Sequence, residues 1–266
     1  MNILDEIIKY KKIEVAKAKE FKSYSELEKE AENTPSGHSL KNSILQRGSP
    51  AVIAEVKRKS PSKGVINDKV SVVDLAVGYE KAGASGLSIL TDDKFFAGSL
   101  NDLEKASRKV KIPLLRKDFI IDEYQLLEAK ACGADVILLI ARVLDPKRTF
   151  ELARFARGLG LEILLEVHNE RELEGFLSKE IDLVGVNNRD LDSFQVDIEL
   201  SFNLISLIPP DFVSVSESGI DSASTLVQLY KAGYKAFLIG ETFMKTADPA
   251  EACASLLKSV HDIVLR

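Results

Sequence analysis

AVIAEVK (51–57) is the first of eight short apolar runs whose regular return along the chain decides the fold. The runs that follow it are GLSIL (86–90), PLL (113–115), DVILLI (135–140), LEILLE (161–166), DLVGV (182–186), FVSVS (212–216) and AFLIG (236–240). Short strands that are apolar along their whole length are typical of parallel sheets covered on both faces. We therefore interpret the runs as eight buried parallel strands.

Amphipathic stretches typical of helices separate these runs. Examples are VVDLAVGYEKAG (72–83), YQLLEAKACG (124–133), TFELARFARGLG (149–160) and ASTLVQLYKAG (223–233), each ending in the glycine that favours a helix C-terminus. Strict alternation of strand and helix predicts parallel pairing through right-handed crossovers. No GxGxxG motif follows the first strand, which disfavours an open doubly wound sheet. We predict an α/β fold, a (β/α)8 TIM barrel with eight strands and eight helices.

The segment before the barrel, residues 1–48, carries lysines and glutamates between spaced apolar residues, which is typical of helix. We expect one helix from Asn2 to the break at TPSG (34–37), and a second short helix from Leu40 to Gln46. The chain, residues 1–266, is then a single barrel domain with a helical N-terminal extension. Its start lacks the apolar run of a signal peptide, and no run approaches the ~18 residues of a membrane span. We expect a cytoplasmic protein.

The bulk composition restricts the possible partners. The chain has 266 residues, 45% hydrophobic and 29% charged, with a formal net charge of -5. This mild acidity argues against nucleic acid or an anionic membrane as the main partner. Cys132 and Cys253 are interpreted as small packing residues, because two scattered cysteines form neither a disulfide framework nor a zinc spacing. No histidine or carboxylate group has metal-ligand spacing, so no metal is predicted.

Charged and amide residues interrupt the apolar strands at their carboxyl ends, where barrel active sites collect. By strand alternation they fall on the same faces as the inward apolar residues, and they are Glu55, Lys57, Lys117, Glu166, His168, Asn187, Arg189 and Glu217. Isolated charge inside a barrel mouth is costly unless it is paired or used. A solvated rim or a structural ring of ion pairs is the alternative, but convergence of the set on one rim favours a functional site.

Three loops after strands are rich in small residues. SPSKG (60–64) follows the first strand, SESG (216–219) the seventh and IGET (239–242) the eighth. Taken singly, each is readily explained as a turn. Together, the last two predict a phosphate site, because barrels commonly bind phosphate between the ends of strands 7 and 8.

Several other polar residues are given structural interpretations. His38 and His261 are expected at the surface or in packing, and Tyr124 in packing. Asp92, Asp93 and Lys94 are expected to form a solvated turn. His168 lies nearer the rim, where it would support Glu166.

Seven stretches resemble the motifs of the indole-3-glycerol phosphate synthase family, in the family's order from the first strand to the eighth. They are IAEVKRKSPSKG (53–64), LSILTDDKFFAGS (87–99), LLRKDFIIDEYQ (114–125), LLEVH (164–168), VGVNNRDL (184–191), SESGI (216–220) and LIGETFM (238–244). The resemblance covers nearly the whole chain and includes the helical extension before the barrel. It implies a TIM-barrel enzyme of tryptophan biosynthesis.

The resemblance also implies a reaction. The substrate would be the phosphorylated small molecule 1-(2-carboxyphenylamino)-1-deoxyribulose 5-phosphate, whose ring carbon attacks the sugar ketone before carbon dioxide and water leave. No metal or organic cofactor takes part. Lys117, as an ammonium that titrates near pH ~10.4 when unperturbed, would protonate the ketone oxygen. Glu166 would be the base of dehydration, and Lys57 or Lys117 would assist departure of the hydroxyl.

By the same resemblance, Glu55 would orient Lys57 or act as a base, and Asn187 and Glu217 would hold sugar hydroxyls or the lysines. The implied substrate-binding residues are Phe96, Phe119 and Leu138 around the anthranilate ring, Ser60, Ser218, Gly219, Gly240 and Glu241 at phosphate and loop positions, and Arg189 as an ion-paired support of the rim. Three positions depart from the family pattern: Phe95, Ala97 and Glu241. Some relatives carry serine in place of Glu241, so its backbone N–H is expected to contribute more than its side chain.

Two alternatives remain. Phosphoribosylanthranilate isomerase, another phosphate-binding barrel, uses a cysteine at its first strand, whereas this chain has Glu55 and Lys57 there. A non-catalytic barrel that binds a phosphorylated metabolite would be favoured by loss of Lys117 or Glu166, and both are present. The sequence leaves the oligomeric state open, with a monomer preferred.

Overall fold

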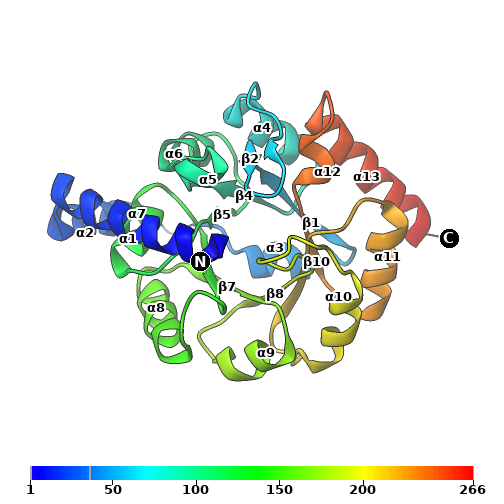
Figure 1. Cartoon of the computed structure of the whole chain (residues 1–266). Helices are drawn as coiled ribbons and strands as arrows, with labels where there is room; N and C mark the ends of the chain where they lie inside the picture. The colour runs from blue at the N-terminus through cyan, green and yellow to red at the C-terminus, as the bar shows by residue number, and fades with distance from the viewer. Residues whose placement is uncertain (1, 36, 266) are drawn as a thin grey trace.

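The computed structural model describes residues 2–35 and 37–265, and within them eight parallel strands close into a barrel (Figure 1). The barrel strands are β1 (Ala51–Val56), β4 (Gly86–Leu90), β5 (Leu114–Lys117), β6 (Val136–Ile140), β7 (Glu162–Val167), β8 (Leu183–Asn187), β9 (Val213–Glu217) and β10 (Ala236–Ile239). Each overlaps one of the predicted apolar runs. The TIM-barrel prediction is therefore confirmed.

Helices surround the barrel, with one following each strand (Figure 1). They are α4 (Val72–Ala82), α6 (Leu100–Ser107), α7 (Glu123–Ala131), α8 (Pro146–Gly158), α9 (Glu170–Phe176), α10 (Glu199–Leu204) continued by the 3-10 turn η1 (Ile205–Leu207), α11 (Ala223–Ala232) and α13 (Pro249–Val264). Gly83 and Gly133 follow their helices with φ of 93° and 80°, a left-handed conformation that suits glycine. Short helices α5 (Asp93–Phe96) and α12 (Glu241–Met244) are added after β4 and β10.

Side chains alternate along the strands between the barrel interior and the helix layer. On β1, Ala51 and Ile53 belong to an inner apolar cluster, whereas Val52 and Ala54 pack with the surrounding helices. Continuing the inward row by two residues places Glu55 above Ile53, at the carboxyl end of the strand. This alternation explains why charged residues that are distant in sequence meet at one mouth.

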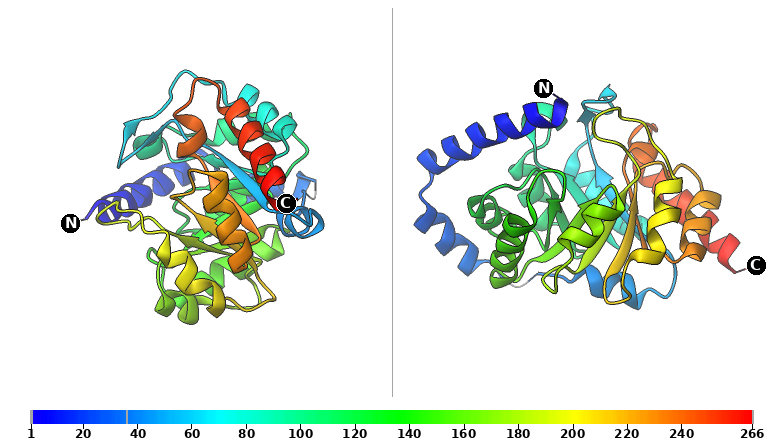
Figure 2. Two further views of the ribbon diagram at one scale, coloured as in Figure 1. Left: turned by 90° about the vertical axis from the view of Figure 1, so that its right-hand side faces the viewer. Right: turned by 60° about the horizontal axis from the view of Figure 1, so that its bottom comes forward.

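The N-terminal extension closes both ends of the barrel. Helix α1 (Ile3–Phe21) crosses the carboxyl mouth, and α3 (Leu40–Gln46) lies at the opposite end (Figure 2). The predicted single helix up to the break at 34–37 was wrong, because the chain turns at Lys22 and restarts as α2 (Tyr24–Asn33). Ser23 begins α2 with a capping box in which Ser23 and Glu26 satisfy each other's backbone N–H groups. Ser36, within the expected break, lies outside the described residues.

A buried ion cluster fixes α1 to the barrel. The ammonium of Lys11 is fully buried and lies 2.9 Å from Glu14, 3.0 Å from Asp92 and 2.9 Å from Asp118. The expected solvated turn is therefore wrong for Asp92, which is fully buried and also accepts the N–H of Phe95 at the start of α5. Lysine can be buried in this way because three carboxylates replace its hydration.

The loop after β1 forms a small hairpin. Strands β2 (Lys59–Ser60) and β3 (Gly64–Val65) pair antiparallel beside the mouth, an element that the sequence analysis did not predict. Over the described ranges, no helix is both long and apolar enough to cross a membrane.

Candidate active site

A cavity of about 580 Å³ opens at the carboxyl end of the strands, beneath α1. Every residue predicted for the site lines it: Glu55, Lys57, Ser60, Phe96, Lys117, Phe119, Leu138, Glu166, Asn187, Arg189, Glu217, Ser218, Gly219, Gly240 and Glu241. Its volume lies in the range of small-molecule sites. The solvated-rim alternative is thereby disfavoured, since these side chains surround one enclosed space.

Lys117 is at the centre of the charged residues. Its Nζ lies 2.8 Å from Glu166 Oε2 and 3.6 Å from Glu217 Oε2, and all three side chains are largely buried. Burial alone would lower the pKa of Lys117, but the two carboxylates hold that pKa well above its usual range. Burial would raise the pKa of Glu166, whereas Lys117 lowers it to about 2. The pair is therefore an ammonium and a carboxylate at neutral pH.

The pKa of Glu217 is shifted in the opposite direction to that of Glu166. Burial raises its pKa to about 8, and the nearby charges of Glu166 and Glu55 add to this effect against the opposing effect of Lys117. Gly185 on β8 makes room for the side chain, because a Cβ there would lie 2.2 Å from Glu217 Oε1. That oxygen is buried and has no hydrogen-bond partner in residues 2–35 and 37–265. It is therefore available to a polar group of a ligand.

A second pair lies on β1 and the residue after it. Lys57 Nζ lies 2.6 Å from Glu55 Oε1, and the Glu55 side chain is almost fully buried. Gly240 provides the space, since a Cβ at that position would lie 2.6 Å from the same carboxylate oxygen. The cavity thus holds two lysines, each paired with a glutamate from a barrel strand.

Polar neighbours hold Glu166 in place. Asn187 Nδ2 donates to Glu166 Oε1 at 3.2 Å, while Asn187 Oδ1 accepts from Ser218 Oγ at 2.9 Å. His168 does not line the cavity, but its Nε2 lies 3.4 Å from Glu166 Oε1 and its Nδ1 lies 3.3 Å from Glu172. His168 therefore lies behind Glu166, outside the cavity, with its Nε2 near the carboxylate but without a hydrogen bond to it in the described residues.

One half of the cavity is apolar. Phe96 and Phe119 lie with their ring centroids 6.1 Å apart and their planes tilted by 39°, and Leu138 lines the cavity with them. Ile3, Leu4 and Ile7 of α1 also line it, and none of these three residues was predicted for the site. Their helical spacing was visible in the sequence, but the surface that they face was not.

The other half presents backbone donors and cations. Ser218 and Gly219 have φ of 65° and 76°, and the Ser218 carbonyl accepts a hydrogen bond from Asn188 Nδ2 at 3.0 Å. Asn188 is buried and thus holds a strained turn; it was not among the predicted site residues, although it lies in the motif NNRDL. The N–H groups of Gly219 and Gly240 donate to no backbone acceptor among the described residues. Such N–H groups favour an anion.

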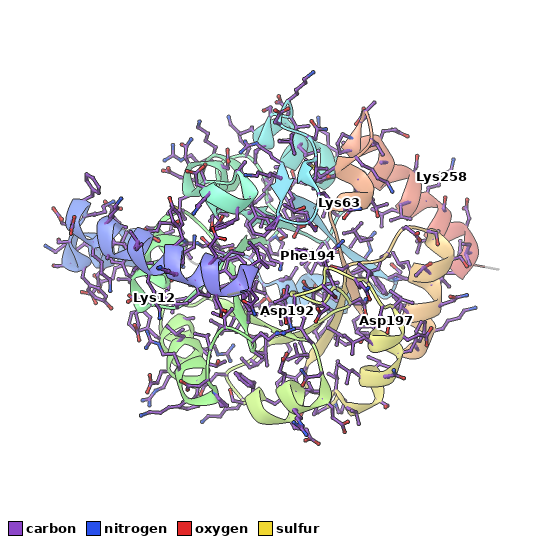
Figure 3. All side chains as sticks on the ribbon, in the orientation of Figure 1. Lys12, Lys63, Asp192, Phe194, Asp197 and Lys258 are labelled. Atoms are coloured by element: carbon purple, nitrogen blue, oxygen red, sulfur yellow. The ribbon has the colours of Figure 1, made fainter. Side chains whose placement is uncertain are left out.

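Arg189 and Lys63 extend over this half. Arg189 Nη2 donates to Glu241 Oε2 at 3.0 Å, and Lys63 Nζ lies 3.6 Å from Glu241 Oε1. Figure 3 shows Lys63 and Phe194 on loops near the centre of the mouth, and both residues line the cavity. Lys63 was not among the predicted site residues, although its loop SPSKG was.

Other side-chain chemistry lies outside the cavity. Cys253 is buried and Cys132 half-buried, and neither cysteine lines the cavity, which removes the main feature of the isomerase alternative. No group of three or more His, Cys, Asp or Glu residues suited to a metal ion occurs in the part of the chain described.

Comparison with solved structures supports the barrel fold alone, because sequence identity is low. The α-subunit of tryptophan synthase from Legionella pneumophila matches with a TM-score of 0.61 at 14% identity, covering 85% of this chain and 97% of that chain. A thiamine phosphate pyrophosphorylase from Pyrococcus furiosus matches with a TM-score of 0.61 at 15% identity, covering 85% of this chain and 100% of that chain.

Sequence relatives are much more similar. An indole-3-glycerol phosphate synthase from Bacteroides thetaiotaomicron is 47% identical, covering 98% of this chain and 99% of the relative. One from Caldanaerobacter subterraneus is 45% identical, covering 91% and 93%. A family model described as indole-3-glycerol phosphate synthase matches residues 4–256. This chain belongs to the indole-3-glycerol phosphate synthase family.

Proposed function

We propose that this chain closes the indole ring of indole-3-glycerol phosphate, with Lys117, Glu166, Lys57, Glu55, Asn187 and Glu217 as the residues that carry the reaction. The observation that supports this most directly is the buried contact between Lys117 and Glu166, 2.8 Å apart at the centre of the cavity. An acid and a base that are held together, and both charged at neutral pH, suit a reaction that needs one proton delivered and another removed.

The two halves of the cavity suit the two ends of the proposed substrate. The apolar wall of Phe96, Phe119 and Leu138 matches a planar anthranilate ring. The backbone N–H groups of Gly219 and Gly240 suit the phosphate at the other end. A substrate bound between these ends brings its ketone carbon next to Lys117, so the binding energy at both ends orients the reacting centre.

In the first step, the ring carbon that bears the carboxylate attacks the ketone carbon. The ketone oxygen takes a proton from the Lys117 ammonium, and the new carbon–carbon bond is kept when carbon dioxide leaves. Nearby carboxylates keep Lys117 protonated until a stronger base, the developing alkoxide, is formed beside it. Glu217 and Asn187 hold the sugar hydroxyls, since Glu217 Oε1 has no partner among the described residues.

In the second step, water is eliminated to complete the aromatic ring. The Glu166 carboxylate removes a proton from the CH2 carbon next to the nitrogen, Lys57 delivers a proton to the hydroxyl that departs from the former ketone carbon, and the double bond between these two carbons forms. Glu55, 2.6 Å from Lys57 Nζ, keeps that lysine charged and oriented. No metal or organic cofactor enters either step.

The surroundings of the enzyme are also part of the proposal. A phosphorylated, carboxylated substrate does not cross membranes freely, so the enzyme must share a compartment with the source of its substrate, and the cytoplasm is the compartment that we propose. We also propose that the enzyme acts as a monomer, because all the residues assigned to the reaction lie in one cavity within a single chain.

The test is a steady-state assay with the ribulose phosphate substrate, following the fluorescence of the indole product. The chain has no tryptophan, so the protein background is low. Lys117→Ala should lower kcat by about 100- to 10,000-fold, the usual contribution of one acid–base group, while substrate still binds. The matched control is Lys231→Ala, at an exposed position on α11. Equal turnover by both variants, with unchanged circular dichroism, would remove Lys117 from the mechanism.

A further inference from the structure

The phosphate half of the cavity contains an anion of the protein's own. The Glu241 carboxylate accepts a hydrogen bond from Arg189 and lies 3.6 Å from Lys63 Nζ. These residues come from α12, from the loop after β8 and from the β2–β3 hairpin. One carboxylate therefore connects three segments at the side of the mouth where Gly219 and Gly240 lie.

The cations that Glu241 holds are the ones that a phosphate group would need. Five cationic side chains line the cavity among the described residues: Lys57, Lys63, Lys117, Arg189 and Lys245. Glu55 and Glu166 already pair with Lys57 and Lys117. Of the remaining three, two contact Glu241.

Arg189 is also fixed in position. Its Nη1 donates to the Phe194 carbonyl at 3.1 Å, and its side chain is only 21% exposed. The hydrogen bond to Phe194 thus fixes the orientation of the guanidinium. Its Nη2 donor points toward the position that the Glu241 carboxylate occupies and that a phosphate would occupy in its place. Arginine is well suited to bind phosphate through charge-assisted hydrogen bonds, and here Glu241 accepts the one that Arg189 Nη2 could give to a phosphate.

We propose that Glu241 is an internal competitor of the substrate phosphate: it pairs with Arg189 and Lys63 and must release them before a phosphate group binds both. This inference rests on the proposed function, which takes this half of the cavity as the phosphate end. Because only the fraction of molecules with Arg189 released is competent, the apparent affinity for phosphate falls by that fraction. When the product leaves, the carboxylate recaptures the cations and so favours release.

The test uses inorganic phosphate as the probe and isothermal titration calorimetry as the readout, at constant ionic strength because the contacts are screened by salt. Glu241→Gln keeps the size of the side chain and removes its charge. It should tighten phosphate binding about three- to tenfold, as expected for a partly exposed ion pair together with loss of the competing anion. The matched control is Asp221→Asn, which removes one charge from the same cavity at a residue with no ion pair in the described chain.

The outcomes separate competition from other roles. In an Arg189→Met background, Glu241→Gln should tighten phosphate binding less than in the wild type, because the closer of the two cations that Glu241 holds is gone and only Lys63 remains. Unchanged or weaker binding by Glu241→Gln alone would overturn the inference, as would an equal gain from Asp221→Asn, which would reveal a general charge effect. Turnover of the ribulose phosphate by the wild-type protein is measured in parallel. If the wild-type protein shows no turnover, the proposed function is refuted. If it turns over the substrate but the calorimetric prediction fails, only the role of Glu241 is refuted.

Discussion

The Glu217 carboxyl group links the stability of the protein to pH. Its pKa is about 8 in the folded protein against an ordinary value of 4.5, so above pH 4.5 the folded state binds more protons than the unfolded state. By linkage, its contribution to stability is complete below pH 4.5 and is lost as the pH rises through 8. Replacing Glu217 with glutamine removes this group, so the variant should lose less stability than the wild type across that interval.

The measurement is urea unfolding of both proteins at several pH values between about 3 and about 9, on the order of one pH unit apart. Glu166→Gln is a useful comparison, because a pKa lowered to about 2 contributes stability above pH 4.5 that is lost as the pH falls toward 2. The two variants should therefore differ from the wild type on opposite limbs of the profile. Parallel profiles for wild type and Glu217→Gln would contradict the raised pKa.

Gly185 leaves the space in which the Glu217 carboxyl group lies. A Cβ at Gly185 would lie 2.2 Å from Glu217 Oε1 and 3.2 Å from Leu164 Cδ1. Gly185→Ala should displace the Glu217 carboxyl group, costing about 1–3 kcal/mol of stability from overpacking and most of the turnover. The control is Gly175→Ala on α9, where nothing lies within 4 Å, and alanine there should be neutral or stabilising by up to ~1 kcal/mol. Thermal unfolding and kcat are the readouts, and full activity in Gly185→Ala would show that Glu217 needs no fixed position.

The buried ammonium of Lys11 joins helix α1 to two carboxylates of the barrel, so one substitution tests this attachment. Removing the ammonium leaves Asp92 buried without its cation and leaves Asp118 with Arg116 alone, and breaking a buried pair in this way costs about 3–5 kcal/mol. Lys11→Met should lower the unfolding free energy by about that amount. It should also raise KM, because Ile7 of the same helix lines the apolar half of the cavity.

Lys12→Met is the matched control for this prediction. Lys12 is the next residue of α1, exposed and without an ion pair among the residues described, so its loss should change stability by no more than about 0.5 kcal/mol. Denaturant unfolding and steady-state kinetics of the two variants compare the same chemical change on two faces of one helix. Equal effects would mean that α1 is held by its apolar contacts alone.

The barrel strands could be predicted because each is short, apolar and followed by an amphipathic helix. The alternation of faces, read from Ile53 to Glu55 or from Leu164 to Glu166, then placed the charged residues at one mouth without any tertiary information. The restart of α2 could also have been predicted, since Ser23 and Glu26 have the spacing of a capping box.

Other features depend on contacts between distant parts of the chain. The burial of Asp92 follows from Lys11, 81 positions earlier by the difference of their numbers, and nothing near Asp92 in the sequence indicates it. Asn188 and His168 act through neighbours on other strands or on a following helix, so their positions became clear only with the fold. Sequence periodicity specifies which face a residue lies on, but not which partner covers that face.

Considered as a whole, the molecule has one inner core rather than a barrel with a separate appendage. Leu4 and Ile7 of α1 and Leu40 and Ile44 of α3 belong to the same apolar cluster as the inward residues of the strands. Figure 2 shows these helices at opposite ends of the barrel. We therefore propose that residues 1–266 form one domain, in which the extension loses its packing whenever the barrel opens.

This proposal predicts coincident unfolding of the two regions. The chain lacks tryptophan, so one tryptophan can be introduced at a time. Tyr10→Trp reports on α1, where Tyr10 packs edge-on against Phe95 with centroids 6.0 Å apart, and Tyr230→Trp reports on α11 on the outer layer. If α1 shares the core, the fluorescence of both variants and their circular dichroism should give the same midpoint in urea within about 0.2 M, as two-state behaviour requires. An earlier transition seen only by the probe at position 10 would show that α1 detaches while the barrel persists, and the extension would then be a separate unit.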